Sequence, residues 1–149
     1  MNRNQRGFTI AELLIIIAVI GIIGAAMAPL IFQITNITGY GSSKMIATHE
    51  VQHSSYWFTA DVRAAKAATS GNGSLNLVLH DDSQIDYLLS GSELYRTETT
   101  GTILLARNIS MLAFSVTDNI VMMSITAAPV SKWQASDNGT YYGCMRQTE

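Results

Sequence analysis

The sequence predicts an α+β protein in which a long amino-terminal helical spine, transmembrane at its start, packs on an antiparallel β-meander head. An apolar run over residues 7–32, GFTIAELLIIIAVIGIIGAAMAPLIF, has Glu12 as its one ionisable side chain. As a helix it is long enough to cross a bilayer of about 30 Å. Helical spacing of apolar residues continues to about residue 69, and short runs of strand-forming residues separated by turns follow it.

Length and composition fit one membrane segment and one small exported domain. The chain has 149 residues, a formal net charge of -2 and 13% charged residues. This balance provides no basic surface, so the sequence shows no clear nucleic-acid site. Cys144 is the single cysteine, which excludes an intrachain disulfide and indicates a free thiol.

The charge at Glu12 distinguishes the apolar run from a secretory signal and from a plain anchor. The run is roughly twice as long as a signal's apolar core, which spans about 7–15 residues. A lone carboxylate in hydrocarbon costs about 2.5–3.5 kcal/mol, so Glu12 predicts a partner within the membrane. A bitopic receptor or sensor with an uncleaved anchor is a rival interpretation, which retention of residues 1–7 in the mature protein would favour.

Four features of the amino terminus together resemble the class III leader of type IV prepilins and type II secretion pseudopilins. The basic leader MNRNQRG ends in Gly7, Phe8 follows, Glu12 stands four residues later, and Pro29 lies deeper in the apolar helix. The resemblance implies that a prepilin peptidase cuts between Gly7 and Phe8 and then methylates the amino terminus of Phe8. It implies a structural subunit that needs no cofactor and is not an enzyme.

The same resemblance implies a life cycle and a set of partners. The subunit would insert in the cytoplasmic membrane as a single-pass protein surrounded by lipid. An inner-membrane assembly platform driven by an ATPase would then move it into a cell-surface or periplasmic filament of pilin or pseudopilin subunits. There Glu12 would neutralise the terminal amine of Phe8 in a neighbouring subunit, which avoids an unpaired buried charge.

The apolar helix also carries residues suited to helix packing. Pro29 removes one helix hydrogen bond, so we expect a kink or local melting around Gly24 to Pro29 in the assembled state. Small residues let helices approach closely, although ordinary membrane-helix composition would explain them equally well. These small residues are Gly21, Gly24, Ala25, Ala26 and Ala28.

We expect five segments along the chain. They are a cleaved leader at 1–7, a transmembrane and assembly helix at 8–38, the second half of the helical spine at 39–70, an antiparallel sheet at 71–128 and a carboxyl-terminal tail at 129–149. The glycines of Gly39-Tyr40-Gly41-Ser42-Ser43 predict a kink or short break in the spine.

The second half of the spine has one apolar face. Val51, Phe58, Val62 and Ala65 recur at helical spacing, so this face is expected to pack on the sheet. Charged residues fall on the other faces and predict a solvated surface. They are Asp61, Arg63 and Lys66.

A literal H-E-x-x-H motif lies in the same segment, at His49, Glu50 and His53. On a helix, histidines four residues apart share a face and could bind one zinc ion with Glu50 as general base. A catalytic zinc needs a third protein ligand; the following SSYWF supplies none, and His80 falls in a predicted strand. The sequence therefore favours two half-exposed polar histidines, with a membrane-tethered zinc hydrolase as the less favoured alternative.

Short runs rich in strand formers predict the meander. They span residues 75–80, 85–89, 93–97, 109–116 and 120–127. Residues 102–106 could be a further strand or a crossing segment, and the tail from Pro129 has no clear period and could be flexible. The acidic residues near the first turn lack the order of a calcium loop, so turn formation explains them better. They are Asp81, Asp82 and Asp86.

Several stretches of the remaining chain are similar to the J-type pseudopilins and the larger minor pilins. They are DVRAA, IDYLLSGSELYRT and ILLARNISMLAFSV. In those families the protein belongs to a tip complex that primes assembly of a pilus or pseudopilus. Many major pilins close a carboxyl-terminal loop with a cysteine pair, whereas this chain has Cys144 alone. The resemblance favours a minor pilin or pseudopilin, with a major pilin of the filament shaft as the alternative.

Overall fold

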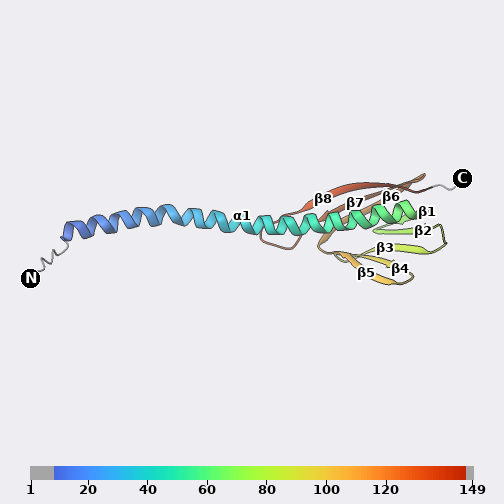
Figure 1. The fold of residues 1–149 in the computed structure, drawn as a ribbon, viewed down its shortest axis with the longest axis horizontal. Coiled ribbons are helices and arrows are strands. Elements are labelled where there is room, and N and C mark those ends of the chain that lie inside the picture. Colours follow the sequence, from blue (N-terminus) through green and yellow to red (C-terminus); the bar gives the residue numbers. More distant parts are fainter. Residues whose placement is uncertain (1–8, 147–149) are drawn as a thin grey trace, which may run out of the picture. The chain divides into compact units, whose positions relative to one another are not determined.

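The computed structural model describes residues 9–146, and its elements are labelled in Figure 1. The chain divides into two units between Gly39 and Tyr40, which are described separately. One helix, α1 (Ile10–Ala64), contributes to both units. The cleavage and methylation residues Gly7 and Phe8 lie outside the described residues.

Helix α1 runs without interruption through the glycines at 39–43, so the expected break there is wrong. Two glycines lower helix propensity by about 1 kcal/mol each, but propensity is a weak term that tertiary packing overrides. In the second unit, buried Ser43 and Ala47 already belong to the packed face of the helix, and the Ser43 hydroxyl donates to Ser131 Oγ at 3.2 Å. Helical structure in this stretch is therefore supported by its contacts.

The helix ends at Ala64, five residues earlier than predicted, and a strand begins at once. Strand β1 (Ala65–Gly71) pairs antiparallel with β2 (Ser74–Leu79) through a tight turn at Asn72 and Gly73. Gly73 has a φ of 72°, a conformation that glycine adopts without steric cost. The alanines at 65, 67 and 68 favour helix by propensity, and pairing with β2 overrides that preference.

The second unit contains two antiparallel sheets. Five strands form the first sheet in the order β1-β2-β3-β4-β5, and three form the second in the order β6-β7-β8. The remaining bounds are β3 (Gln84–Ser90), β4 (Glu93–Glu98), β5 (Gly101–Ala106), β6 (Ile109–Thr117), β7 (Ile120–Ala127) and β8 (Asp137–Cys144). The predicted strands and the β6-β7 hairpin are confirmed, and the segment of uncertain type is β5.

The expected irregular tail is wrong for β8, because all eight of its residues pair with β7. The residues of β8 that point inward are Asp137, Gly139, Tyr141 and Gly143. Two of them are glycines and one is charged, so no alternation of apolar residues marks this strand in the sequence. A strand at the edge of a sheet forms here through pairing with β7 and does not need an apolar pattern of its own.

The core of this unit lies between one face of α1 and the inner faces of both sheets (Figure 1). Phe58 of α1 contacts Phe114 of β6, and Phe114 also contacts Tyr87 of β3, with ring centroids 6.2 Å apart in both pairs. Val51 and Val62 are buried on the same helix face, as predicted. The α+β fold with a helix spine and a β head is confirmed.

Candidate functional site

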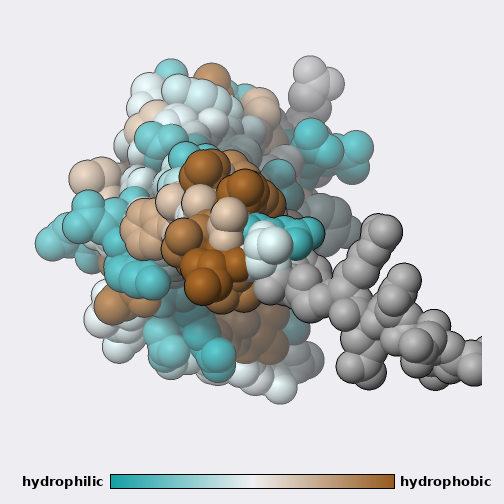
Figure 2. Space-filling model, turned by 90° about the vertical axis from the view of Figure 1, so that its left-hand side faces the viewer, coloured by the Kyte–Doolittle hydropathy of each residue, from teal (hydrophilic) through white to brown (hydrophobic). Residues whose placement is uncertain are grey.

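The described part of the first unit is an apolar helix with an exposed surface. Every described residue from Thr9 to Thr35 is exposed, and an 18-residue window has a mean hydropathy of 2.8. Figure 2, viewed toward the amino-terminal end of α1, shows apolar side chains at this surface. Such a surface is stable only in lipid or against other apolar helices, so its partner lies outside this unit.

The start of α1 explains the position of Glu12 in local terms. Thr9 precedes the helix, and its Oγ1 accepts a hydrogen bond from the Glu12 backbone N–H at 3.3 Å. This is the first half of a T-x-x-E capping box, in which a threonine satisfies a free N–H of the first turn. A carboxylate in the first turn also stabilises the helix through a favourable interaction with the helix dipole. The exposed Glu12 follows by four residues in the sequence the position where the predicted cut would create a new amine.

Pro29 and the glycines of the first unit lie on open helix surface. Pro29 is inside α1, where its ring removes one backbone donor. A Cβ atom added at Gly21 or Gly24 would meet no atom within 4 Å. No contact within the unit therefore requires a glycine at either position. Without side chains, both positions leave the helix backbone accessible to a neighbouring helix.

In the second unit, the structure gives His53 a role that competes with zinc binding. Trp57 Nε1 lies 3.2 Å from His53 Nε2, and His53 Nδ1 lies 2.8 Å from the Leu105 carbonyl oxygen. An indole N–H can only donate, so Nε2 accepts and the protonated Nδ1 donates to Leu105. Both ring nitrogens are then occupied, and neither has a lone pair free for a metal.

Glu50 and His49 complete this arrangement. Glu50 Oε2 accepts the backbone N–H of Arg107 at 2.9 Å, immediately after β5. The His49 ring stacks on the His53 ring with an interplanar angle of 12°. His53 and Glu50 thus satisfy backbone groups at the outer edge of the five-stranded sheet, which is a common protection of an edge strand. The H-E-x-x-H residues join helix to sheet in this structure.

The second unit contains a buried ion pair that was not predicted from the sequence. Arg96 of β4 donates to Asp61 of α1 through Nε at 2.7 Å and through Nη2 at 3.1 Å. Tyr87 donates its hydroxyl to Asp61 Oδ2 at 2.5 Å, and Arg96 Nη1 donates to Glu98 at 3.0 Å. The Arg96 guanidinium also lies over the Trp57 ring, 4.8 Å from its centroid. This bidentate pair links α1 to the first sheet.

Burial and charge shape the chemistry of that cluster. Asp61 and Arg96 are 7% and 5% exposed, so the prediction that Asp61 lies on a solvated face is wrong. Burial, followed by the nearby Asp61 charge, raises the pKa of Tyr87 far above its usual value. The hydrogen bonds from Arg96 to Asp61 raise the pKa of Arg96. Tyr87 therefore stays protonated and donates to Asp61, and the cluster stabilises the packing of α1 on the first sheet.

The period of each element could have revealed this pair. Asp61 follows Phe58 by three residues on α1, so both lie on the packed face. Arg96 follows Leu94 by two residues on β4, and alternate residues of a strand point to the same side. Asp61 and Arg96 therefore both point into the core, and their opposite charges predict that they pair.

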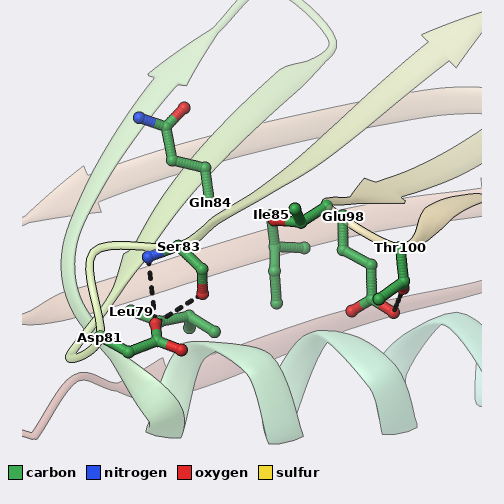
Figure 3. A pocket seen from close by; sticks show the side chains of 8 residues that line it. Leu79, Asp81, Ser83, Gln84, Ile85, Glu98 and Thr100 are labelled. Atoms are coloured by element: carbon green, nitrogen blue, oxygen red, sulfur yellow. Dashed lines mark hydrogen bonds between the residues drawn. The ribbon is translucent and has the colours of Figure 1, made fainter.

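Asp81 acts within the first turn, as predicted, whereas Asp82 pairs with Lys66 of β1, and Asp86 lies in β3 and accepts from Asn76. Asp81 Oδ1 accepts from the Ser83 backbone N–H at 3.0 Å and from the Ser83 hydroxyl at 2.5 Å, and these bonds lower the pKa of Asp81. Figure 3 shows this pair beside Ile85, with Glu98 accepting from Thr100 across the same shallow pocket. Among residues 9–146, no three His, Cys, Asp or Glu side chains gather as a metal site.

Comparison with known proteins gives one match. Residues 2–28 match the family described as the prokaryotic N-terminal methylation motif. The searches of curated proteins and of solved structures found no significant match. The matched segment includes Gly7, Phe8 and Glu12, and it confirms the leader recognised in the sequence.

Proposed function

We propose, from the premise that this chain is a type IV pilin-like subunit carrying a class III leader, that it is cut between Gly7 and Phe8 and assembles into a filament. The observation that carries this proposal is the apolar helix of the first unit, whose described surface is exposed throughout. A cut before this helix keeps it on the mature protein. The helix can then serve first as a membrane anchor and later as an assembly surface.

Assembly replaces lipid around the helix by copies of the same helix. The gain comes from packing at small residues, because lipid tails are already as apolar as leucine. Gly21 and Gly24 have open space above their Cα atoms and could lie in such contacts. Glu12 would pair with the methylated amine of Phe8 in a neighbour, so that neither charge enters the bundle alone.

We infer that the subunit is a minor pilin or pseudopilin. Cys144 is exposed and is the one cysteine of the chain, so no disulfide closes the carboxyl-terminal end. That end is instead fixed by the pairing of β8 with β7. A major pilin is the second candidate, and abundance in the filament distinguishes the two.

The test is mass analysis of the amino-terminal peptide from membranes and from sheared filaments, in cells with and without their prepilin peptidase. We expect a peptide that begins at methylated Phe8, depends on the peptidase and is present at trace level in filaments. High abundance would indicate a major pilin. A chain that keeps Arg3 and Arg6 in peptidase-competent cells would contradict the proposal and favour an uncleaved anchor.

The role of Glu12 has its own matched test. Glu12→Gln removes the charge and keeps the shape, so we expect a processed subunit that remains in the membrane and is depleted from filaments. Glu50→Gln makes the same change in the same helix, where a glutamine oxygen can still accept from Arg107. If both variants entered filaments equally well, the proposed pairing of Glu12 with the amine of Phe8 would be wrong.

A further inference from the structure

The outward face of the three-stranded sheet carries no charged side chain. The register of β6, β7 and β8 places its residues in four rows across the strands. These rows are Met111-Thr126-Asn138, Ala113-Ser124-Thr140, Ser115-Met122-Tyr142 and Thr117-Ile120-Cys144. The opposite face, which includes Leu112, Val121 and Met123, is buried against the core. The outward face is therefore a neutral, solvent-accessible surface.

Four polar side chains converge on a hollow in this face. It is lined by Met111, Ser124, Thr126, Asn138, Gly139 and Thr140. Within the described residues, the side chains of Ser124, Thr126, Asn138 and Thr140 make no hydrogen bond to the protein. Their hydrogen-bonding capacity is directed to the solvent side of the sheet.

Some polar side chains on the other sheet pair with one another. Asn76 donates to Asp86 at 2.7 Å, and the hydroxyls of Thr97 and Thr102 lie 2.9 Å apart. There, surface polar groups satisfy one another across strands. The four neighbouring polar side chains of the hollow have no such partners in the described part of the chain and are left for an external molecule.

We propose that this hollow binds a neutral polysaccharide. Three hydroxyls and one carboxamide can each donate and accept, which matches the alternating donors and acceptors of sugar hydroxyls. Such a ligand exchanges its bonds to water for bonds to the protein without burying an unpaired charge. Tyr142, 65% exposed, lies one row from the hollow and offers an aromatic face for an adjoining sugar ring.

The lack of charge argues against the other polymers. Nucleic acids and acidic glycans are bound through Lys and Arg that neutralise their anionic groups, and this face has neither residue. An apolar peptide would leave the polar groups of the hollow without partners. A neutral polyhydroxyl chain satisfies them and can follow the row of polar residues along β8.

This inference goes beyond the proposed function and does not depend on it, because binding can be measured whether or not the chain is processed. A single shallow hollow gives weak binding, and repetition along a filament would raise the overall avidity without new contacts. The site would then serve attachment to a neutral polysaccharide surface.

The test uses the full chain in a detergent without a sugar headgroup and measures binding of cellohexaose, chitohexaose and an alginate oligomer by ligand-observed NMR and calorimetry. We expect a neutral oligosaccharide to bind and alginate not to bind. Thr140→Val and Asn138→Ala should each weaken binding about two- to tenfold, the effect of one lost hydrogen bond. Tyr142→Ala should weaken it by a similar factor or more.

Thr117→Val is the matched control, because it makes the same exchange on the same sheet face in the row farthest from the hollow. It should leave affinity unchanged, and circular dichroism should show each variant folded. Ser124→Ala, a smaller change inside the hollow, provides a second reading if Thr140→Val alters the fold. Binding of alginate in preference, equal binding by all variants, or binding by neither neutral sugar would each overturn the proposal.

Discussion

The two parts of α1 have the same secondary structure but opposite surroundings. From Thr9 to Thr35 every described residue is exposed, although most are apolar. From Ser43 to Val62 the helix buries one stripe in the core, including Phe58 at 0% exposed, and leaves its other faces to solvent. A helix that is apolar all round needs partners on all sides, whereas an amphipathic helix needs one sheet.

This contrast shows where each part finds its stabilising contacts. The second part is fixed by contacts within its own chain, among them the Asp61–Arg96 pair and the packing of Val62. The first part finds none within its unit, so its partners are lipid or other subunits. Substitutions in the second part should therefore act on folding, and substitutions in the first part on membrane insertion and assembly.

The largest effect should come from Arg96→Met, which leaves Asp61 buried without its cation. Breaking a buried pair on one side costs about 3–5 kcal/mol, because the remaining charge is uncompensated. Urea unfolding followed by Trp57 fluorescence should report this loss, since Arg96 lies over that ring. Adding Asp61→Asn should restore much of the stability, because the buried charge is then gone and Tyr87 keeps an acceptor.

Arg107→Met is the control for this prediction. Arg107 is 66% exposed at its side chain and lies 3.7 Å from Glu93, so its loss should change stability by less than about 0.5 kcal/mol. If Arg96→Met and Arg107→Met lowered the free energy of unfolding by the same small amount, the buried pair would not stabilise the second unit.

A smaller effect is expected from Gly143→Ala, which tests the contact between α1 and β8. A Cβ at Gly143 would lie 2.5 Å from Val62 Cγ1, so helix and strand must move apart. Overpacking of this kind costs about 1–3 kcal/mol. Gly41→Ala, in open space on the same helix, should instead stabilise by up to about 1 kcal/mol. Thermal unfolding that shifts in the same direction for both would contradict the close approach.

His53→Ala should have a more modest effect and also tests the zinc alternative. It removes the acceptor of Trp57 and the donor to Leu105, at a cost of about 1 kcal/mol. His49→Ala, at an exposed position, should cost less. Because both His53 nitrogens are engaged, neither zinc nor a chelator should move the unfolding temperature. A zinc-dependent rise that His53→Ala abolishes would restore the metal-site interpretation.

The sequence predicted those parts of the fold that follow a clear apolar pattern. The alternation Leu75, Leu77 marks β2, and the spacing Val51, Phe58, Val62 marks the packed face of α1. Strand β8 could not be predicted in this way, since glycine takes two of its four inward positions. The boundary at Ala64 was also hidden, because the alanines that follow it favour helix and only pairing with β2 makes them a strand.

The candidate assembly residues were predictable for a different reason. Glu12 stands out because a charge in an apolar run is costly, so one residue carries the signal. Asp61 and Arg96 gave no such signal, since each resembles an ordinary surface charge until helix and strand periods are combined. The neutral hollow required the register of three strands, two of which, β6 and β8, lie about 30 residues apart in the chain.

A small, pH-dependent contribution is expected from Asp137 at the start of β8. Hydrogen bonds from Lys44 and then from Thr48 lower the pKa of Asp137 in the folded chain. Its stabilisation is therefore complete above the unfolded pKa of about 3.9 and is lost as the pH falls through the lower folded value. Since Lys44 is 40% exposed, the contribution should stay below about 1 kcal/mol and weaken in salt.

Asp137→Asn measures that contribution. Its stability should fall below that of the wild type at about pH 7 and approach it as the pH falls below the lowered folded pKa of Asp137, where the wild-type carboxylate is protonated. Asp118→Asn makes the same exchange on the β6-β7 turn, outside the ion pair with Lys44, and is the control; it should change stability less than Asp137→Asn at about pH 7. If the difference in stability between Asp137→Asn and the wild type persisted at low pH, the carboxylate charge would not be what stabilises β8.

Removal of residues 1–39 should have the smallest effect on the folding of the second unit, although it is the largest change to the chain. The second unit contains its own core, and no described residue of the first unit before Asn36 is even partly buried. The fragment from Tyr40 should therefore unfold cooperatively within a few degrees of the full chain in detergent, because the described residues that it loses are exposed apart from the partly buried Asn36 and Gly39. The same deletion should abolish membrane association, which fractionation would detect. A fragment that fails to fold would show that the amino-terminal helix stabilises the second unit, and the separation of folding from assembly along α1 would then be wrong.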